Sequence, residues 1–85
     1  METAFNPITD NEYLGGNSLF LNHVAEKYDN NKSFAGYRQW KEIGRSVKKG
    51  EKGHKILVIF KDKKGDTKPT SRTVFNFMQT EKIEK

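Results

Sequence analysis

The stretch from Val47 to Phe60, VKKGEKGHKILVIF, constrains the fold more than any other part of the chain. Four lysines surround two glycines, and five consecutive apolar residues follow, from Ile56 to Phe60. Glycine permits positive φ and tight turns, so the stretch predicts a lysine-bearing turn leading directly into a strand. Because the apolar run is unbroken, we expect that strand to be buried on both faces. Such a turn can hold a phosphate backbone, although a solvated lysine turn has the same spacing.

Charge is unevenly distributed along the 85 residues. Residues 1–36 contain two lysines and five acidic residues, a net charge of −3. Residues 37–85 contain fourteen Lys or Arg and six acidic residues, a net charge of +8. The basic half is therefore expected to face a polyanionic partner.

Length and composition favour a single domain over residues 1–85. The 33% hydrophobic residues are clustered, which indicates a folded chain. There is no cysteine, hence no disulfide framework or thiolate metal site. No apolar run approaches the roughly 20 residues of a membrane span, and the N-terminus lacks a signal-peptide pattern. We therefore expect a cytoplasmic protein with no membrane partner.

The first half of the chain predicts an arm and a helix. Residues 1–16, with Pro7 and a Gly-Gly pair, are expected to form an irregular arm, in which Tyr13 either folds onto the core or offers its ring to a base. Asn17 and Ser18 are candidate N-caps for an amphipathic helix over 19–28. Its apolar side is expected to carry Phe20, Leu21, Val24, Ala25 and Tyr28.

A second helical stretch runs from Phe34 to Gly44 and is expected to start near Gly36. Three residues recur on one face: Tyr37, Trp40 and Ile43. A neighbouring basic stripe contains Arg38, Lys41 and Arg45. Trp40 beside this stripe suits either a core position or an exposed stacking platform.

The remainder predicts a hairpin. A charged, glycine-containing turn over 61–66 is followed by Pro69, so regular pairing is expected to resume only after that residue. The return strand is expected over 73–78, and residues 80–85 as a flexible tail. The predicted fold class is α+β: two main helices packed on a small antiparallel sheet with a β-hairpin, a pattern that leaves a winged-helix-like arrangement open.

The residues do not suit catalysis. The chain lacks a cysteine nucleophile, a G-x-S-x-G elbow and a G-x-x-x-x-G-K-[ST] phosphate loop. His23 and His54 stand apart, and neither belongs to an H-E-x-x-H motif. We expect a binding protein rather than an enzyme, with no metal and no cofactor.

Several segments together resemble one protein family. They are Asn6-Pro7-Ile8-Thr9, Tyr13-Leu14-Gly15-Gly16-Asn17, Tyr37-Arg38-Gln39-Trp40, Val47-Lys48-Lys49-Gly50-Glu51-Lys52-Gly53, Val74-Phe75-Asn76 and Gln79-Thr80-Glu81. Their order is similar to that in the N-terminal single-stranded-DNA-binding domain of ArdC-type antirestriction proteins. Members of that family carry a second, metalloprotease-like domain with H-E-x-x-H, which this sequence does not contain.

The resemblance implies a sequence-tolerant single-stranded DNA (ssDNA) binder from a plasmid, phage or other mobile element, acting in antirestriction or in DNA replication or transfer. Basic side chains would follow the backbone, and aromatic rings would stack on bases. The candidate nucleic-acid-binding residues are Tyr13, Asn17, Arg38, Gln39, Trp40, Lys41, Arg45, Lys48, Lys49, Lys52, Lys55 and Arg72.

Two alternatives remain open from the residues. The chain could be a small accessory subunit or inhibitor that docks on a replication or defence enzyme, such as a primase, polymerase or helicase. It could also be a winged-helix-like binder of double-stranded DNA, with Arg38, Gln39, Lys41 and Arg45 in a groove.

Overall fold

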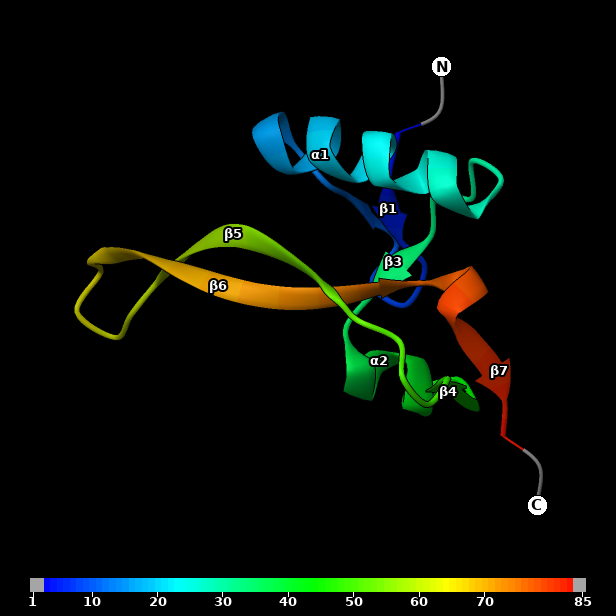
Figure 1. The fold of residues 1–85 in the computed structure, drawn as a ribbon. Coiled ribbons are helices and arrows are strands. Elements are labelled where there is room, and N and C mark those ends of the chain that lie inside the picture. The colour runs from blue at the N-terminus through cyan, green and yellow to red at the C-terminus, as the bar shows by residue number, and fades with distance from the viewer. Residues whose placement is uncertain (1–2, 84–85) are drawn as a thin grey trace.

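A long β-hairpin forms the centre of the fold (Figure 1). In the computed structural model, which describes residues 3–83, β5 (His54–Lys61) pairs antiparallel with β6 (Thr67–Asn76). The Asp62 N–H donates to the Asp66 carbonyl oxygen at 2.9 Å and closes the turn between the strands. The predicted charged hairpin is therefore present, and its tip projects beyond both helices (Figure 1).

The hairpin register places Pro69 inside the paired region, opposite Ile59. Hydrogen-bonded and non-hydrogen-bonded pairs alternate along an antiparallel ladder. Counting from the Asp62–Asp66 bond, Ile59 and Pro69 form a non-hydrogen-bonded pair. Proline is tolerated there because no N–H is required. The expectation that pairing resumes only after Pro69 is therefore wrong.

Strand β5 is buried on one face only. Ile56 points into the core, whereas Leu57 and Ile59 are 65% and 73% exposed. The strand lies at the edge of a sheet with the order β3–β6–β5. The expectation of a strand buried on both faces is wrong, because an antiparallel hairpin is stable with one face covered and the other solvated.

Short antiparallel pairs surround the hairpin. They are β1 (Phe5–Asn6) with β2 (Asn11–Glu12), β3 (Phe34–Ala35) with the end of β6, and β4 (Arg45–Val47) with β7 (Thr80–Lys82). The arm expected over residues 1–16 thus contains the β1–β2 pair. Residues 80–82, expected in a flexible tail, form β7 instead, since β4 satisfies their backbone groups. Residues 1–2 and 84–85 lie outside the described part of the chain.

Helix α1 (Gly15–Ala25) lies above the hairpin in Figure 1 and continues into the 3-10 turn η1 (Glu26–Tyr28). The predicted first helix is confirmed in type, but it begins earlier. Asn17 and Ser18 lie in its first turn, and Leu14 occupies the N-cap position without a side-chain hydrogen bond. The N-cap assignment of Asn17 and Ser18 is therefore wrong.

The core lies between α1 and the hairpin. Its buried apolar side chains are Ala4, Leu21, Val24, Ala25, Phe34, Ile56 and Val74. Apolar burial contributes about 25 cal/mol per Å², so this cluster is a main source of stability. Phe20 was expected among these residues but is 44% exposed. Successive helical residues are rotated by about 100°, and this rotation places Phe20 at the rim of the buried face.

Helix α2 (Tyr37–Glu42) lies on the other side of the hairpin from α1 (Figure 1). It begins after Gly36, as predicted, and Gly44 follows its end with φ of +81°. The return strand ends at Asn76, and Phe77–Gln79 form a second 3-10 turn, η2. The predicted α+β class is confirmed, with one main helix and one short helix where two main helices were expected.

Candidate nucleic-acid interface

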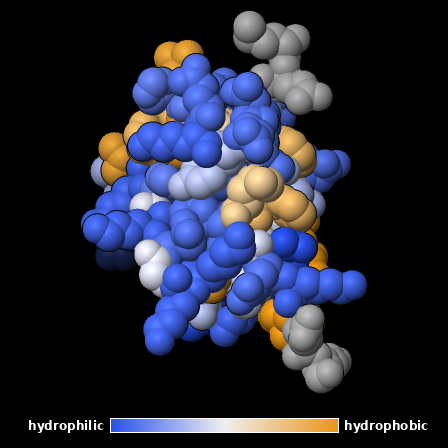
Figure 2. Space-filling view, turned by 45° about the vertical axis from the view of Figure 1, so that its right-hand side comes forward, coloured by the Kyte–Doolittle hydropathy of each residue, from blue (hydrophilic) through white to orange (hydrophobic). Residues whose placement is uncertain are grey.

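The surface is largely hydrophilic on the face seen in Figure 2, where hydrophobic residues gather in small separate areas. A cleft of about 700 Å³ opens between the N-terminal arm, the first turn of α2 and the hairpin. Its lining residues are Asn6, Tyr13, Gly36, Tyr37, Arg38, Gln39, Ile56, Val58, Ser71, Arg72, Thr73 and Val74. The cleft therefore joins segments that are far apart in the sequence.

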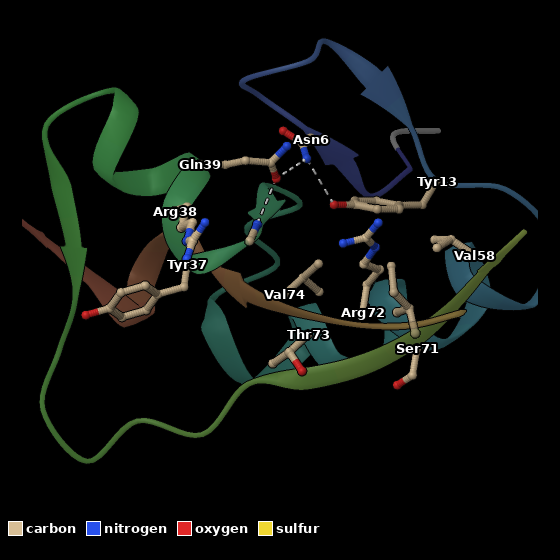
Figure 3. A pocket seen from close by; sticks show the side chains of 12 residues that line it. Asn6, Tyr13, Tyr37, Arg38, Gln39, Val58, Ser71, Arg72, Thr73 and Val74 are labelled. Carbon is tan, nitrogen blue, oxygen red and sulfur yellow. Dashed lines mark hydrogen bonds between the residues drawn. The ribbon is translucent and has the colours of Figure 1, made fainter. Parts of the chain in front are cut away.

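Asn6 ties the arm to α2. Its side-chain oxygen accepts hydrogen bonds from the N–H groups of Ile8 at 2.9 Å and Thr9 at 3.2 Å. Its side-chain nitrogen donates to Oε1 of Gln39 at 2.9 Å. The turn after β1 is thus held in shape by Asn6, which fixes one wall of the cleft (Figure 3).

Tyr13 forms part of the same wall. Its hydroxyl donates to the Phe34 carbonyl oxygen at 2.8 Å. Burial raises the pKa of this hydroxyl above its ordinary value, and the hydrogen bond with Asn6 offsets part of that rise. The residue therefore both anchors the arm and borders the cleft, and Arg72 points toward its ring (Figure 3).

Gln39 has a structural role at the start of α2. Its Oε1 accepts from the Gly36 N–H at 2.9 Å as well as from Asn6. The bond from Gly36 satisfies an N–H at the start of α2 that has no partner within the helix. The bond from Asn6 ties the helix to the N-terminal arm. Gln39 thus shapes the cleft, but its side-chain oxygen is occupied by hydrogen bonds within the protein.

The exposed polar and aromatic groups of the cleft come from α2 and β6. Arg38 and Arg72 are both exposed and approach it from these two elements (Figure 3). Tyr37 is 48% exposed, with the Lys41 ammonium 4.7 Å from its ring centroid. Phe75 supports the ring by an edge contact at 6.3 Å between centroids. This arrangement provides cations and a flat ring at one site.

Tyr37 lines the cleft but was not among the residues predicted to bind nucleic acid; it was predicted only to share one face of the second helix with Trp40 and Ile43. The spacing of Tyr37 and Lys41, four residues apart on a helix, was the available signal for an exposed cation–aromatic pair. Ser71 and Thr73 carried no comparable signal. They line the cleft only because β6 runs past α2.

The backbone of β6 also faces the cleft. Ser71 and Thr73 follow Pro69 by two and four residues, so, like Pro69, they form non-hydrogen-bonded pairs with β5. Their N–H and C=O groups therefore point away from β5. A Cβ built on Gly36 would lie 3.9 Å from the Thr73 carbonyl oxygen, which confirms that this edge faces α2. The cleft thus offers backbone donors and acceptors besides its side chains.

The lysine turn lies outside the cleft lining but against its wall. Gly50 has φ of +88°, and the Glu51 N–H donates to the Lys48 carbonyl oxygen at 3.2 Å, so the expected glycine turn is present. Gly53 packs on β6 beside Thr73. The four lysines, all exposed, are Lys48, Lys49, Lys52 and Lys55.

Gln79 holds this turn in place from the core. Its side-chain nitrogen donates to the Lys52 carbonyl oxygen at 2.8 Å and to the Glu51 carboxylate at 3.1 Å. Its Oε1 accepts from the Asn76 N–H at 2.8 Å and lies 3.2 Å from Nε2 of His54. The lysine turn is therefore fixed by hydrogen bonds to the buried side-chain amide of Gln79.

Three candidates are committed to the fold instead. Trp40 is 1% exposed and its indole N–H donates to the Phe75 carbonyl oxygen at 2.9 Å, so it offers no stacking face. Arg45 donates from Nε to the Thr80 hydroxyl at 2.8 Å and from Nη2 to the Thr80 carbonyl oxygen at 3.0 Å. The Asn17 side chain bonds both backbone groups of Leu57.

Four of the twelve predicted residues line the cleft: Tyr13, Arg38, Gln39 and Arg72. Lys41 is placed beside it by its contact with Tyr37. Across residues 3–83, no group of three or more His, Asp or Glu side chains is placed to hold a metal ion. No helix in that part of the chain is long and apolar enough to cross a membrane.

A family model described as the N-terminal domain of anti-restriction factor ArdC matches residues 1–84. No curated protein matches the chain. The fold is similar to the Mn(II)-bound crystal structure of the antirestriction ArdC protein from plasmid R388, with a TM-score of 0.80 and 27% identity over 96% of this chain. The metal-free structure of that protein gives a TM-score of 0.73 and 28% identity over 98%. The chain spans 35% and 34% of the two solved chains, about a third of their length.

Proposed function

Because the chain belongs to the family of the N-terminal domain of anti-restriction factor ArdC, we propose that it is a sequence-tolerant ssDNA-binding module of a mobile genetic element. It acts by binding, not catalysis, in antirestriction or in DNA replication or transfer. The observation that carries the proposal is the cleft, which two exposed arginines and a half-exposed tyrosine line along an open strand edge.

The cations bind the phosphate backbone. Arg38 lines the cleft from α2 and Arg72 from β6, so a strand lying in it meets a guanidinium from each of the two elements. Guanidinium groups bind phosphate in bidentate fashion, and backbone N–H groups such as those of Ser71 and Thr73 add neutral donors. Lys41 and the lysine turn extend the positive surface to either side.

The Tyr37 ring stacks on a base. It is about half exposed, and Phe75 and Lys41 hold it in place, so little conformational entropy is lost on stacking. A base must be unpaired to reach such a ring, which favours single strands over duplex. Every base has a π face, so stacking carries little sequence preference.

A duplex reader is less well supported. Helix α2 has six residues, and Gln39 and Trp40 within it hydrogen-bond to other parts of the chain. A recognition helix presents several side chains to base edges. Helix α2 therefore has few side chains free to contact base edges, as the winged-helix-like alternative would require.

The decisive experiment measures binding of fluorescent oligothymidine, a duplex and an RNA of equal length at two salt concentrations. We expect micromolar-order affinity for ssDNA, weaker duplex binding, and a steep loss of affinity with salt, since each neutralised phosphate contributes a slope of about −0.7 for single strands. The double variant Arg38→Ala/Arg72→Ala should bind at least about tenfold more weakly.

The matched control is Lys63→Ala/Lys64→Ala at the exposed hairpin tip, which removes the same charge far from the cleft. This control should retain most of the affinity. Equal losses in the two variants would show that net charge, not the cleft, determines binding. Equal affinity for duplex and single strand would contradict the proposal.

A further inference from the structure

The outer edge of β5 carries a hydrogen-bonding pattern that the nucleic-acid cleft does not use. The Leu57 N–H donates to Oδ1 of Asn17 at 3.2 Å, and the Asn17 side-chain nitrogen donates back to the Leu57 carbonyl oxygen. The side-chain carboxamide of asparagine offers an N–H donor and a C=O acceptor on one planar amide, as a backbone peptide group does. Asn17 therefore occupies the position that a peptide group of an adjacent strand would take.

The same pattern continues toward the hairpin tip. Ile59 lies two residues after Leu57 on the strand, so its N–H and C=O groups also point away from β6. Its partner across the ladder, Pro69, has no N–H to donate, which is consistent with this orientation. Among residues 3–83, the side chains of residues 60 and 61 aside, no hydrogen bond to these two groups of Ile59 is present. One edge position is thus covered by a side-chain amide, and the next is open.

Apolar side chains accompany this edge. Leu57 and Ile59 point to the outer face of the hairpin and are mostly exposed. Phe20 follows Asn17 by three positions on the same side of α1 and is also partly exposed. Aliphatic side chains beside an open strand edge are typical of strand addition, in which the main chain provides affinity and alternate side chains provide contacts.

Charge selects the occupant. Residues 54–76 contain six Lys or Arg and two acidic residues, a net charge of +4. A second copy of this hairpin would be repelled, and α1 stands beside the edge where a second folded domain would have to approach. Nucleic acid is less well suited, because the side chains on the strand itself, Leu57 and Ile59, are aliphatic and offer no ring for stacking, and the one ring nearby, Phe20, is more than half buried.

We propose that the outer edge of β5 is a docking site for an extended acidic segment of a protein partner. The segment adds as a strand along Ile59 and displaces the Asn17 carboxamide from Leu57. The exchange replaces one pair of amide hydrogen bonds by an equivalent pair, so displacement has little cost. The Leu57 and Ile59 side chains then contact the apolar residues of the added strand.

The test uses a synthetic peptide in which glutamate alternates with valine, with binding followed by fluorescence anisotropy. Two control peptides are the same sequence with alternate amides N-methylated, and a lysine–valine version. Binding of the first peptide alone supports the site. Equal binding of the N-methylated peptide would overturn it, because charge attraction without backbone pairing would then explain the affinity.

Two variants of the protein sharpen the result. Ile59→Pro removes the outward N–H without breaking the ladder to β6 and should abolish peptide binding, whereas Ile59→Thr keeps the N–H and should weaken it only in part. Asn17→Ala uncovers Leu57 and should tighten binding about fivefold. Circular dichroism and thermal melting establish that each variant is folded.

The competing ligand is tested in parallel. Oligothymidine affinity should be the same for Ile59→Pro as for the parent protein. Loss of oligothymidine binding in Ile59→Pro, or competition between oligothymidine and the peptide, would place β5 in the nucleic-acid site and overturn the proposal. Failure of the Arg38/Arg72 experiment alone would leave this edge site unaffected.

Discussion

Gly53 lies so close to Thr73 that a Cβ on the glycine would be 2.2 Å from Thr73 Cγ2. The Phe75 ring is the next neighbour, with atoms at 3.0 and 3.1 Å from the same point. The lysine turn can therefore lie against β6 only with glycine at this position. This contact joins the segment that most constrains the fold to the strand that lines the cleft.

Gly53→Ala should destabilise the protein by about 1–3 kcal/mol, because overpacking forces the turn away from β6. Thermal and urea unfolding measure the loss. Gly16→Ala is the matched control: its new methyl would meet nothing within 4 Å. Alanine in a helix is preferred over glycine, so that control should be neutral or stabilising. A neutral Gly53→Ala would contradict the packing described here.

Trp40→Ala should cost about 3–5 kcal/mol of folding free energy and can unfold so small a domain. The reason is that the ring is buried against Phe77, at 6.1 Å between centroids, and anchored to the Phe75 carbonyl oxygen. Trp40→Phe keeps much of the packing and should be folded. Its ssDNA affinity should match that of the parent protein, and a selective loss of binding would return Trp40 to the interface.

Stability should fall as pH falls below about 6.5, the ordinary histidine pKa. Burial lowers the pKa of His54, and nearby Lys27 acts in the same direction, whereas Gln79 and Glu51 offset part of the effect. The unfolded chain thus binds the proton more readily than the folded protein. The contribution is fully present above about 6.5 and is lost as pH falls toward the folded pKa.

Urea unfolding at a series of pH values measures this dependence. In His54→Asn the part of the slope between neutral and mildly acidic pH should disappear, whatever the absolute stability of that variant. An identical slope in the parent protein and His54→Asn would assign the dependence to other groups.

Lys48→Ala/Lys49→Ala tests whether the lysine turn clamps phosphate. Affinity for ssDNA should fall, and the salt slope should decrease by about 0.7 for each lost contact. Melting temperature should change little, because exposed charges contribute only about 0–1 kcal/mol each. Unchanged affinity with an unchanged salt slope would restrict the site to the cleft arginines and Lys41.

Local sequence patterns predicted the elements whose causes are local. The amphipathic spacing around Leu21 and Val24 predicted the first helix, Gly36 and Gly44 bounded the second, and the glycines of the lysine turn predicted a turn before β5. In each case the residue type itself restricts the backbone or requires burial on one side of a helix. Clustered lysines likewise indicated a basic surface.

Tertiary structure decided which faces are covered and which polar groups remain free. The run from Ile56 to Phe60 has the composition of a strand buried on both faces, yet Leu57 and Ile59 are exposed because only the opposite face of the hairpin is covered at these positions. Asn17 and Arg45 were predicted to bind nucleic acid, but Asn17 is held by the backbone of Leu57, 40 residues away, and Arg45 by the hydroxyl and carbonyl oxygens of Thr80, 35 residues away. Such long-range hydrogen bonds depend on how distant segments meet, which periodicity in one segment cannot encode.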